Sequence, residues 1–223
     1  MTLDVVLGSR VTRTRLYTIL GLGLPIIGGM VSQNILNLVD MAMVGTLGDA
    51  ALAGVGLGSF MNFMGHSIVI GLGVGVQAVV ARRFGEGAKD ATLTALYAGI
   101  ILALLISIPA MSLFFTTAPR LFPLLIDDPA VIAEGAPYMQ VRFLGMAAVG
   151  MNFAFRGFWN GINLSIIYLR TIVLMHSVNI ALNYVLIFGA LGVPALGSLG
   201  AGIGTAVATY VGSAYYALLV WRF

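Results

Sequence analysis

The chain has 223 residues, of which 60% are hydrophobic and 9% charged, and its mean hydropathy is +1.03. This composition excludes an ordinary water-soluble domain and predicts a membrane protein. The formal net charge is +3, and the absence of cysteine excludes disulfides and thiolate metal sites.

Six stretches are long and apolar enough to cross a bilayer, which takes about 20 residues. In chain order they cover approximately residues 16–44, 51–80, 91–115, 137–158, 171–189 and 197–220. Their continuous apolar runs lack the alternation of barrel strands, so the sequence predicts an all-α membrane protein. We expect a single transmembrane domain over residues 1–223. Arg142 and Arg156 leave the fourth span a short uncharged interval, and their long stems can reach the two interfaces.

Basic residues gather on one side of the predicted bundle. If the N-terminus lies inside the cell, the outer side holds only Arg120 and Arg142. The inner side then holds Arg10, Arg13, Arg15, Arg82, Arg83, Lys89, Arg156, Arg170 and Arg222. This asymmetry predicts a multi-pass protein of the inner (plasma) membrane with a cytoplasmic N-terminus. It also accounts for the net positive charge, so we expect no nucleic-acid partner.

Asp40 is the one carboxylate inside a predicted span, and Gln33 and Asn37 precede it on the same helical face. An ionisable group in the membrane is costly and usually marks an ion or substrate pathway. Because desolvation disfavours the ionised form, Asp40 can take up a proton on one side and release it on the other; sodium is the other candidate ion. An organic cation bound to the ionised form would compete with the proton at one site, which is the minimum chemistry of antiport. The alternative is a helix-end position near the outer interface, paired with Arg142 or hydrated.

Polar residues also share faces of later spans. Tyr138 begins the fourth, and His176, Asn179 and Asn183 follow one face of the fifth. Together with the first span they predict a shared water-accessible cavity, and the alternative is scattered hydrogen bonds between helices. His176 is either a proton relay or an interhelical hydrogen-bond partner. Pro25 removes a backbone hydrogen bond from the first span and is either a hinge or a tolerated membrane proline.

Enzymatic chemistry finds no support in the sequence. Lys89 is the only lysine and belongs to no Walker A motif, so the chain is not expected to hydrolyse ATP. No nucleophile–base pair and no cluster of metal ligands is present. We therefore expect neither an enzyme, nor a cofactor, nor a metal centre beyond a sodium ion at Asp40.

Several segments are similar to one transporter family. They are residues 24–26 (LPI), 38–45 (LVDMAMVG), 47–48 with 51–53 (LG, ALA), 155–157 (FRG) and 179–189 (NIALNYVLIFG). These segments resemble the MATE (multidrug and toxic compound extrusion) family, and within it the DinF-like branch. The resemblance implies a six-helix bundle that is the N-terminal lobe of a twelve-helix exporter of amphipathic, often cationic compounds.

By position, the resemblance assigns Asp40 to the acid at which such transporters bind the coupling ion. Pro25 corresponds to a proline that bends with protonation, and Asn179 and Tyr138 correspond to polar partners of the acid. Asn183 departs from DinF-like members that carry a second carboxylate there. Since an amide cannot titrate, Asp40 would then carry the titration alone or with His176.

The expected function is secondary active multidrug efflux by proton- or sodium-coupled antiport. The expected partners are membrane lipids, amphipathic cationic small molecules and a second six-helix lobe, which is a missing C-terminal half, a separate chain or a second copy. Two alternatives remain open. One is a flippase for lipid-linked substrates, which a wide basic cavity would favour and for which Arg142 and Arg156 are available. The other is a non-transporting half subunit that needs a second lobe.

Overall fold

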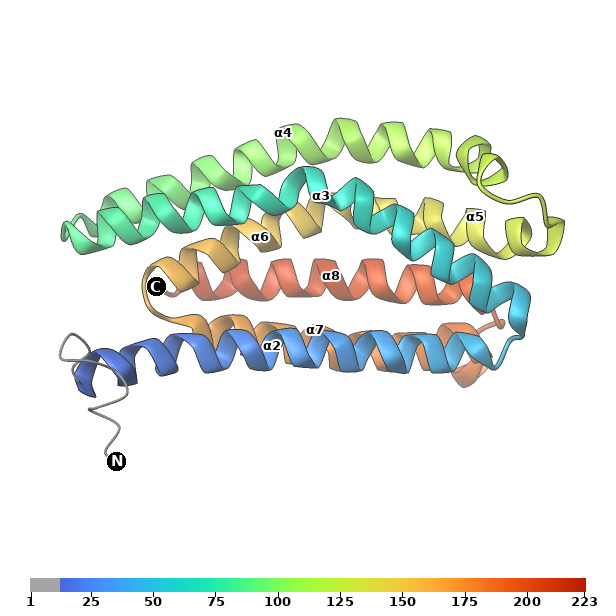
Figure 1. The fold of residues 1–223 in the computed structure, drawn as a ribbon, viewed down its shortest axis with the longest axis horizontal. Helices are drawn as coiled ribbons and strands as arrows, with labels where there is room; N and C mark the ends of the chain where they lie inside the picture. Colours follow the sequence, from blue (N-terminus) through green and yellow to red (C-terminus); the bar gives the residue numbers. More distant parts are fainter. Residues whose placement is uncertain (1–12) are drawn as a thin grey trace, which may run out of the picture.

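The computed structural model describes residues 13–223, and over that range it contains helices and no strands (Figure 1). The long elements are α2 (Arg13–Gly45), α3 (Asp49–Gly85), α4 (Lys89–Leu121), α5 (Pro129–Leu144), α6 (Met146–Gly161), α7 (Ser165–Phe188) and α8 (Gly197–Trp221). Two short 3₁₀ turns, η1 (Phe122–Leu124) and η2 (Ala190–Gly192), complete the set. The predicted all-α fold is confirmed. Arg10, one of the basic residues assigned to the inner side, lies outside the described residues.

Five of the described helices are long and apolar enough to cross a membrane, namely α2, α3, α4, α7 and α8. Each overlaps one predicted span nearly end to end. At a rise of about 1.5 Å per residue, even the 24-residue α7 reaches roughly 36 Å, which exceeds the hydrocarbon thickness. Length and composition alone were therefore sufficient to locate these five elements.

The fourth span, predicted as one helix over residues 137–158, is wrong in that form. The structure divides it between α5 and α6, which have 16 residues each and follow one another along the bundle (Figure 1). At the junction the amide of Gly145 donates to the carbonyl of Arg142, three residues back, at 3.1 Å. This tighter turn interrupts the α-helical ladder, and glycine is a weak helix former. The fourth predicted span thus corresponds to two helices placed end to end.

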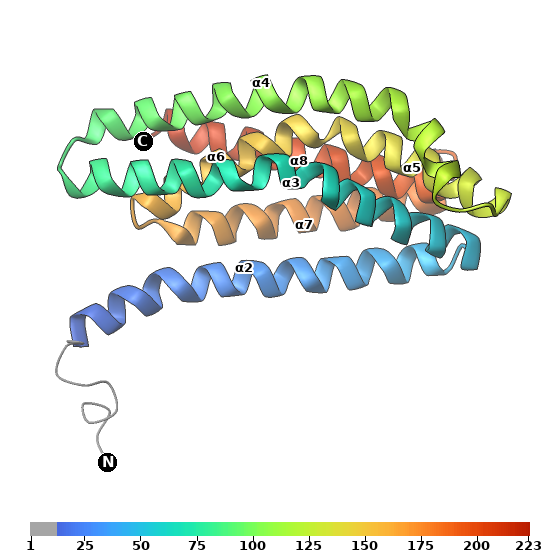
Figure 2. The ribbon, with the colours of Figure 1, turned by 45° about the horizontal axis from the view of Figure 1, so that its top comes forward.

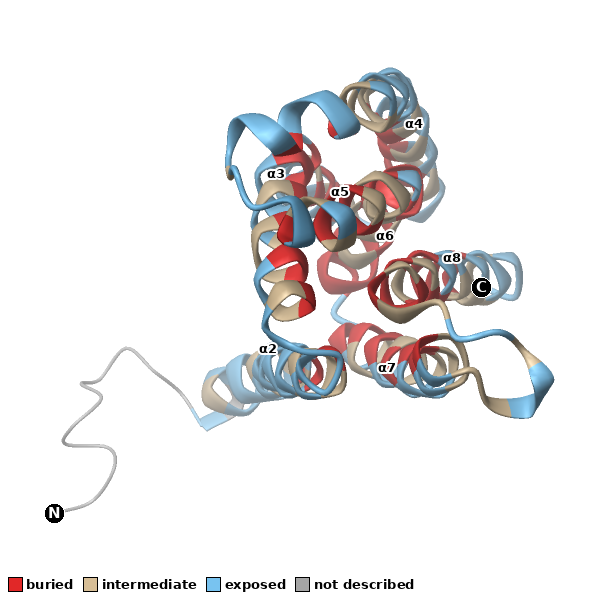
Figure 3. Ribbon diagram, turned by 90° about the vertical axis from the view of Figure 1, so that its right-hand side faces the viewer, coloured by how far each residue is buried: buried red, intermediate tan, exposed pale blue. Residues whose placement is uncertain are grey.

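The helices form two neighbouring groups, which the end view of Figure 3 separates clearly. One group contains α3, α4, α5 and α6, with α3 packed against the other three. The second contains α2, α7 and α8, in which α2 packs chiefly against α7. Helices α5 and α6 contact α8 and join the groups. Figure 2 shows that α2 and α7 run in the same direction along the molecule.

Close helix contacts in the first group depend on glycine. A Cβ atom at Gly54 of α3 would lie 2.8 Å from the backbone nitrogen of Gly135 in α5. A Cβ atom at Gly73 of α3 would lie 2.8 Å from the carbonyl oxygen of Phe153 in α6. Such approaches leave no room for a side chain, and they are a common way for helices to associate in lipid.

Large apolar side chains cover the outside of the bundle. On α2 the exposed ones include Leu24, Ile27, Val31, Ile35 and Leu38. In water this surface would be unfavourable, whereas lipid or a second transmembrane lobe would cover it. The arrangement therefore agrees with a helix bundle embedded in a membrane.

Candidate functional site

A chain of hydrogen bonds begins at Asp40 and crosses three helices. The amide nitrogen of Asn183 in α7 donates to a carboxylate oxygen of Asp40 in α2 at 2.9 Å, and to Oδ1 of Asn179 at 3.1 Å. Nδ2 of Asn179 then donates to the hydroxyl of Thr205 in α8 at 2.9 Å. Both asparagines are almost completely buried, while Asp40 is half-buried. The predicted pairing of Asp40 with the fifth span is therefore direct, but the contact is Asn183, and Asn179 follows it.

A second polar contact joins α2 and α7 farther from the loop that follows Asp40. The hydroxyl of Ser32 and Nδ1 of His176 are hydrogen-bonded at 2.7 Å. The other ring nitrogen of His176 lies 3.4 Å from Oε1 of Gln33, whose amide donates to Oδ1 of Asn37 at 3.2 Å. The polar stripe of Gln33, Asn37 and Asp40 on α2 is hydrogen-bonded to α7 through its first and last members. Gln33 and Asn37 are also exposed.

A cavity of about 530 Å³ opens beside these contacts. It is lined by α2, α3, α5, α6, α7 and α8, and among the predicted residues Gln33, His176 and Asn179 reach it. Asn37, Asp40, Asn183 and Tyr138 are not among the lining residues. A volume of this size suits a drug-sized molecule. A shared cavity is therefore present, but Asp40 stands beside it.

The position of Asp40 bears on the two sequence-based interpretations of this carboxylate. It lies five residues before the end of α2, about 8 Å along the helix, which places it toward one end of the bundle. Among residues 13–223, no ion pair joins Asp40 to Arg142. Asp40 does not line this cavity, and direct competition between an ion and a substrate at this one carboxylate stays a prediction.

Tyr138 belongs to a different contact. Its hydroxyl is hydrogen-bonded to Ser59 of α3 at 2.8 Å, and its ring is buried in a cluster with Val44, Val55, Ile187 and Ala201. The structure thus places the ring of Tyr138 where α5 packs against α3 and α8, without a hydrogen bond to Asp40.

Pro25 lies within α2, which continues as one helix on both sides of it. Figure 2 shows α2 curving toward its N-terminal end. The missing backbone donor of proline is a recognised cause of such bending. The role of Pro25 as a hinge stays a prediction.

Two residues that the sequence reasoning did not select, Ser32 and Tyr168, take part in the site together with Thr205. Ser32 binds His176, Thr205 receives the hydrogen bond of Asn179, and the ring of Tyr168 lies 4.5 Å from the guanidinium carbon of Arg156. Thr205 and Thr209 lie one turn apart on α8, and this spacing had already indicated a polar face of that span. Ser32 directly precedes Gln33, which was a usable signal. Nothing local in the sequence indicated Tyr168.

No group of three or more histidine, aspartate or glutamate side chains able to hold a metal occurs within residues 13–223. One detail is nevertheless relevant to a coupling ion. Oδ1 of Asn183 is buried without a hydrogen-bond partner, next to the amide group that binds Asp40. That oxygen packs against Gly204 of α8, so a rotation of the Asn183 amide is needed to turn it toward Asp40.

The fold and this polar network define a helical membrane protein with a cavity between its helices, and comparisons give its family. The MatE family model matches residues 25–185, and the chain belongs to this family. A probable multidrug resistance protein NorM of Photorhabdus laumondii is 34% identical over 190 residues, covering 82% of this chain and 40% of that protein. Its counterpart from Agrobacterium fabrum is 30% identical over 182 residues, covering 82% of this chain and 39% of that protein.

A solved structure, described as an outward-facing conformation of a multidrug resistance MATE family transporter of the MOP superfamily, is also similar. It gives a TM-score of 0.83 at 28% identity and covers 92% of this chain and 45% of that one. The chain spans less than half the length of these relatives. The MATE resemblance and the correspondence to an N-terminal half are thus confirmed, and the family agrees with the expectation that the chain is not an enzyme. The DinF-like branch stays a prediction, since the relatives compared are NorM proteins.

Proposed function

We propose that the chain forms one lobe of an ion-coupled exporter of amphipathic small molecules, with Asp40 as the residue that binds the coupling ion. The observation that carries the proposal is the hydrogen-bonded chain from Asp40 through Asn183 and Asn179 to Thr205, at the edge of a drug-sized cavity. It gives an ionisable group a route to influence three helices. The related NorM proteins are named as probable multidrug resistance proteins, which supports this proposal.

Coupling in this scheme acts through the network. When Asp40 is ionised, it accepts the hydrogen bond of Asn183 and holds α2 against α7. A proton or a sodium ion bound at Asp40 changes the charge that this amide meets, so the contact between the two helices changes as well. Pro25 then supplies the place at which α2 bends. The ion and the substrate thus exclude one another through helix position.

The residues present suit either coupling ion. A proton needs only the carboxylate of Asp40. A sodium ion would be held by that carboxylate together with Oδ1 of Asn183 once the amide of Asn183 has rotated, because this oxygen now packs against Gly204 while the amide nitrogen faces Asp40. Since Asn183 is an amide, Asp40 is the only titrating member of this network.

Export by alternating access requires more than this lobe. Transporters of repeated architecture place the substrate at the interface between their repeats, and the relatives are more than twice as long as the matched part. We therefore propose a second six-helix lobe as partner, supplied by a C-terminal continuation, a separate chain or a second copy. The exposed apolar face of α2 is available to a lobe or to lipid.

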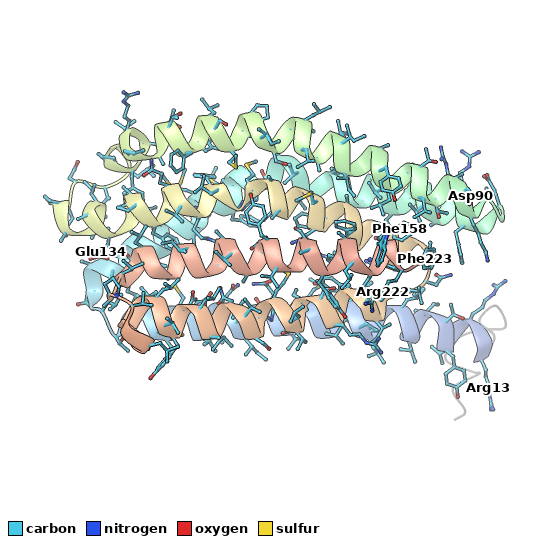
Figure 4. All side chains as sticks on the ribbon, turned by 180° about the vertical axis from the view of Figure 1, so that it is seen from behind. Arg13, Asp90, Glu134, Phe158, Arg222 and Phe223 are labelled. Atoms are coloured by element: carbon cyan, nitrogen blue, oxygen red, sulfur yellow. The ribbon has the colours of Figure 1, made fainter. Side chains whose placement is uncertain are left out.

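We further propose the inner membrane, with the N-terminus in the cytoplasm. Figure 4 places Arg13, Asp90 and Arg222 at one end of the bundle and Glu134 at the other. Arg82 and Arg83 close α3 at the former end. A cytoplasmic location of this basic end follows the positive-inside rule.

A flippase for lipid-linked substrates is the second candidate function, and one observation favours it. Both Arg142 and Arg156 line the cavity, so the basic side chains that such a substrate would need are in place. A non-transporting half subunit is the third reading, and the experiment below separates it from the others.

The test is dye efflux from lipid vesicles under an imposed pH or sodium gradient, with the chain alone and with a C-terminal lobe supplied. Asp40→Asn should abolish gradient-driven efflux. Asp90→Asn, the same change at an exposed position, should leave efflux unchanged. Equal efflux from wild type and Asp40→Asn would overturn the coupling role. No efflux from any form, with either lobe arrangement, would favour the non-transporting subunit.

A further inference from the structure

The cavity carries cationic side chains and no carboxylate among the residues that line it. Arg142 enters it from α5 and Arg156 from α6, and two histidines, His66 and His176, line it from α3 and α7. The expected organic cation would therefore meet like charge and find no counter-charge in the cavity.

Among residues 13–223, neither arginine is in direct contact with a carboxylate, although Arg142 is near enough to Asp40 for their charges to attract. Within the described part of the chain, neither forms an ion pair. Nε of Arg142 is buried without a hydrogen-bond acceptor. Arg156 lies over the ring of Tyr168, with 4.5 Å from its guanidinium carbon to the ring centre. A cation–π contact stabilises the charge in part but does not neutralise it.

Uncompensated charge inside a membrane bundle is unfavourable, because the surrounding medium solvates it poorly. A bound anion would relieve this cost. Arginine is well suited to that task, since its planar guanidinium binds carboxylate, sulfonate-like and phosphate oxygens through paired hydrogen bonds. The unpaired Nε of Arg142 is a donor that such a ligand would satisfy.

Apolar side chains make up much of the remaining lining, beside polar ones such as Asn152, Asn179 and Thr205. Phe63, Phe153, Ile172 and Met175 face the same cavity, together with Met30 of α2. Aromatic and methionine side chains adapt to flat or irregular apolar bodies. The lining therefore combines a basic region with a hydrophobic one.

We propose that this cavity binds amphipathic organic anions, with the anionic group held by Arg142 and Arg156 and the apolar body against Phe63, Phe153 and Met175. Naming these anions as the transported substrates rests on the proposed function. Their binding to the cavity requires neither a gradient nor a second lobe. The anion is either a soluble organic acid or the head group of an anionic lipid, which share the same chemistry.

Binding is measured on the full chain in phosphatidylcholine nanodiscs with anilinonaphthalene sulfonate. Energy transfer from Trp159 and Trp221, the two tryptophans, reports dye that lies close to the protein. The matched probe is N-phenylnaphthylamine, which lacks the sulfonate. Wild type should bind the sulfonate saturably, and Arg142→Gln or Arg156→Gln should weaken it by about tenfold or more. Neither change should affect the neutral probe.

Two further variants keep the result interpretable. Arg120→Gln removes a charge at an exposed position away from the cavity and should leave sulfonate binding unchanged. Arg142→Lys keeps the charge and should bind the sulfonate more tightly than Arg142→Gln, which a loss of folding would not produce. Equal binding of both probes, or no effect of either glutamine variant, would overturn the proposal. Displacement of the dye by millimolar inorganic phosphate as effectively as by unlabelled organic sulfonate would also overturn it, since the apolar body would then contribute nothing.

The source of the anion follows from a competition. If a lipid head group is the occupant, phosphatidylglycerol in the nanodisc should displace the dye in an Arg142-dependent manner. If the occupant is a soluble acid, phosphatidylglycerol should not displace it. Both results support the proposal. Dye binding without ion-driven efflux would overturn the proposed function alone. Efflux that depends on Asp40 without sulfonate binding would overturn the present inference alone.

Discussion

Asn183 of α7 donates a hydrogen bond to Asp40 of α2, with 2.9 Å between Nδ2 and Oδ1. Seven residues earlier on each helix, His176 and Gln33 are in contact, with 3.4 Å between Nε2 and Oε1. Seven residues correspond to about two helical turns. The parallel helices α2 and α7 are thus joined by two polar contacts in the same register, and a change in the charge of Asp40 acts on one of them directly.

Asn183→Leu tests this contact without removing the carboxylate. Leucine has a similar size but cannot donate to Asp40 or Asn179, so the link between α2 and α7 is lost. We expect gradient-driven efflux to fall by about tenfold or more, as for other lost hydrogen bonds to a charged group. Vesicle efflux with the complete transporter measures it. Wild-type coupling in this variant would show that the hydrogen bond has no part in transport.

Gly204 of α8 fixes the position of Asn183 from the opposite side. A Cβ atom at Gly204 would collide with Oδ1 of Asn183, and 3.3 Å would separate it from the backbone nitrogen of that residue. We therefore expect Gly204→Ala to displace Asn183 from Asp40 and to reduce ion-coupled efflux about as strongly as Asn183→Leu.

The matched control is Gly75→Ala in α3, where a Cβ atom has no neighbour within 4 Å. That change should leave efflux unaltered and stabilise the helix by about 0.5–1 kcal/mol, because alanine is the better helix former. Thermal unfolding in detergent and vesicle efflux compare the two variants. Similar behaviour of both would mean that the packing of Gly204 against Asn183 is unimportant.

Pro25→Ala addresses bending of α2. Alanine restores the backbone hydrogen bond to the carbonyl of residue 21 and straightens the helix, so we expect a higher melting temperature and slower efflux. Pro109→Ala makes the same change in α4, which does not line the cavity. This control should raise stability without slowing transport. Unchanged efflux in Pro25→Ala would indicate a proline that the membrane helix merely tolerates.

The sequence was sufficient for most of the fold because hydrophobic length is a local property. Helix α4, expected over 91–115 and observed as Lys89–Leu121, shows how closely an apolar run delimits a helix. The division at Gly145 was missed, although the start of α5 was readable. Asp128 caps that helix by accepting from the amide of Ala130 at 2.8 Å, and Pro129 occupies its first position.

The site was predictable only as faces of helices. Helical periodicity correctly grouped Gln33 with Asp40 and His176 with Asn183, because the residues that share a face of one helix follow from their spacing in the sequence. The choice of partner depends on how two helices are shifted relative to each other, which no single helix encodes. For this reason Ser32 as the partner of His176 was not anticipated.

Substitutions at His176 distinguish its two possible roles, a structural hydrogen-bond contact and a proton relay. Both ring nitrogens lie within hydrogen-bond distance of α2 side chains: Nδ1 contacts the hydroxyl of Ser32, and Nε2 contacts Oε1 of Gln33. These two contacts favour a structural role over a proton relay. We expect His176→Gln to retain most efflux, since an amide can still donate and accept. His176→Leu should destabilise the protein by about 1–3 kcal/mol, because it leaves part-buried polar groups unpaired. Thermal unfolding and efflux under a pH gradient, measured on both variants, decide between the roles. If glutamine abolished proton-driven efflux while preserving stability, a titrating ring would be required and His176 would act as the relay.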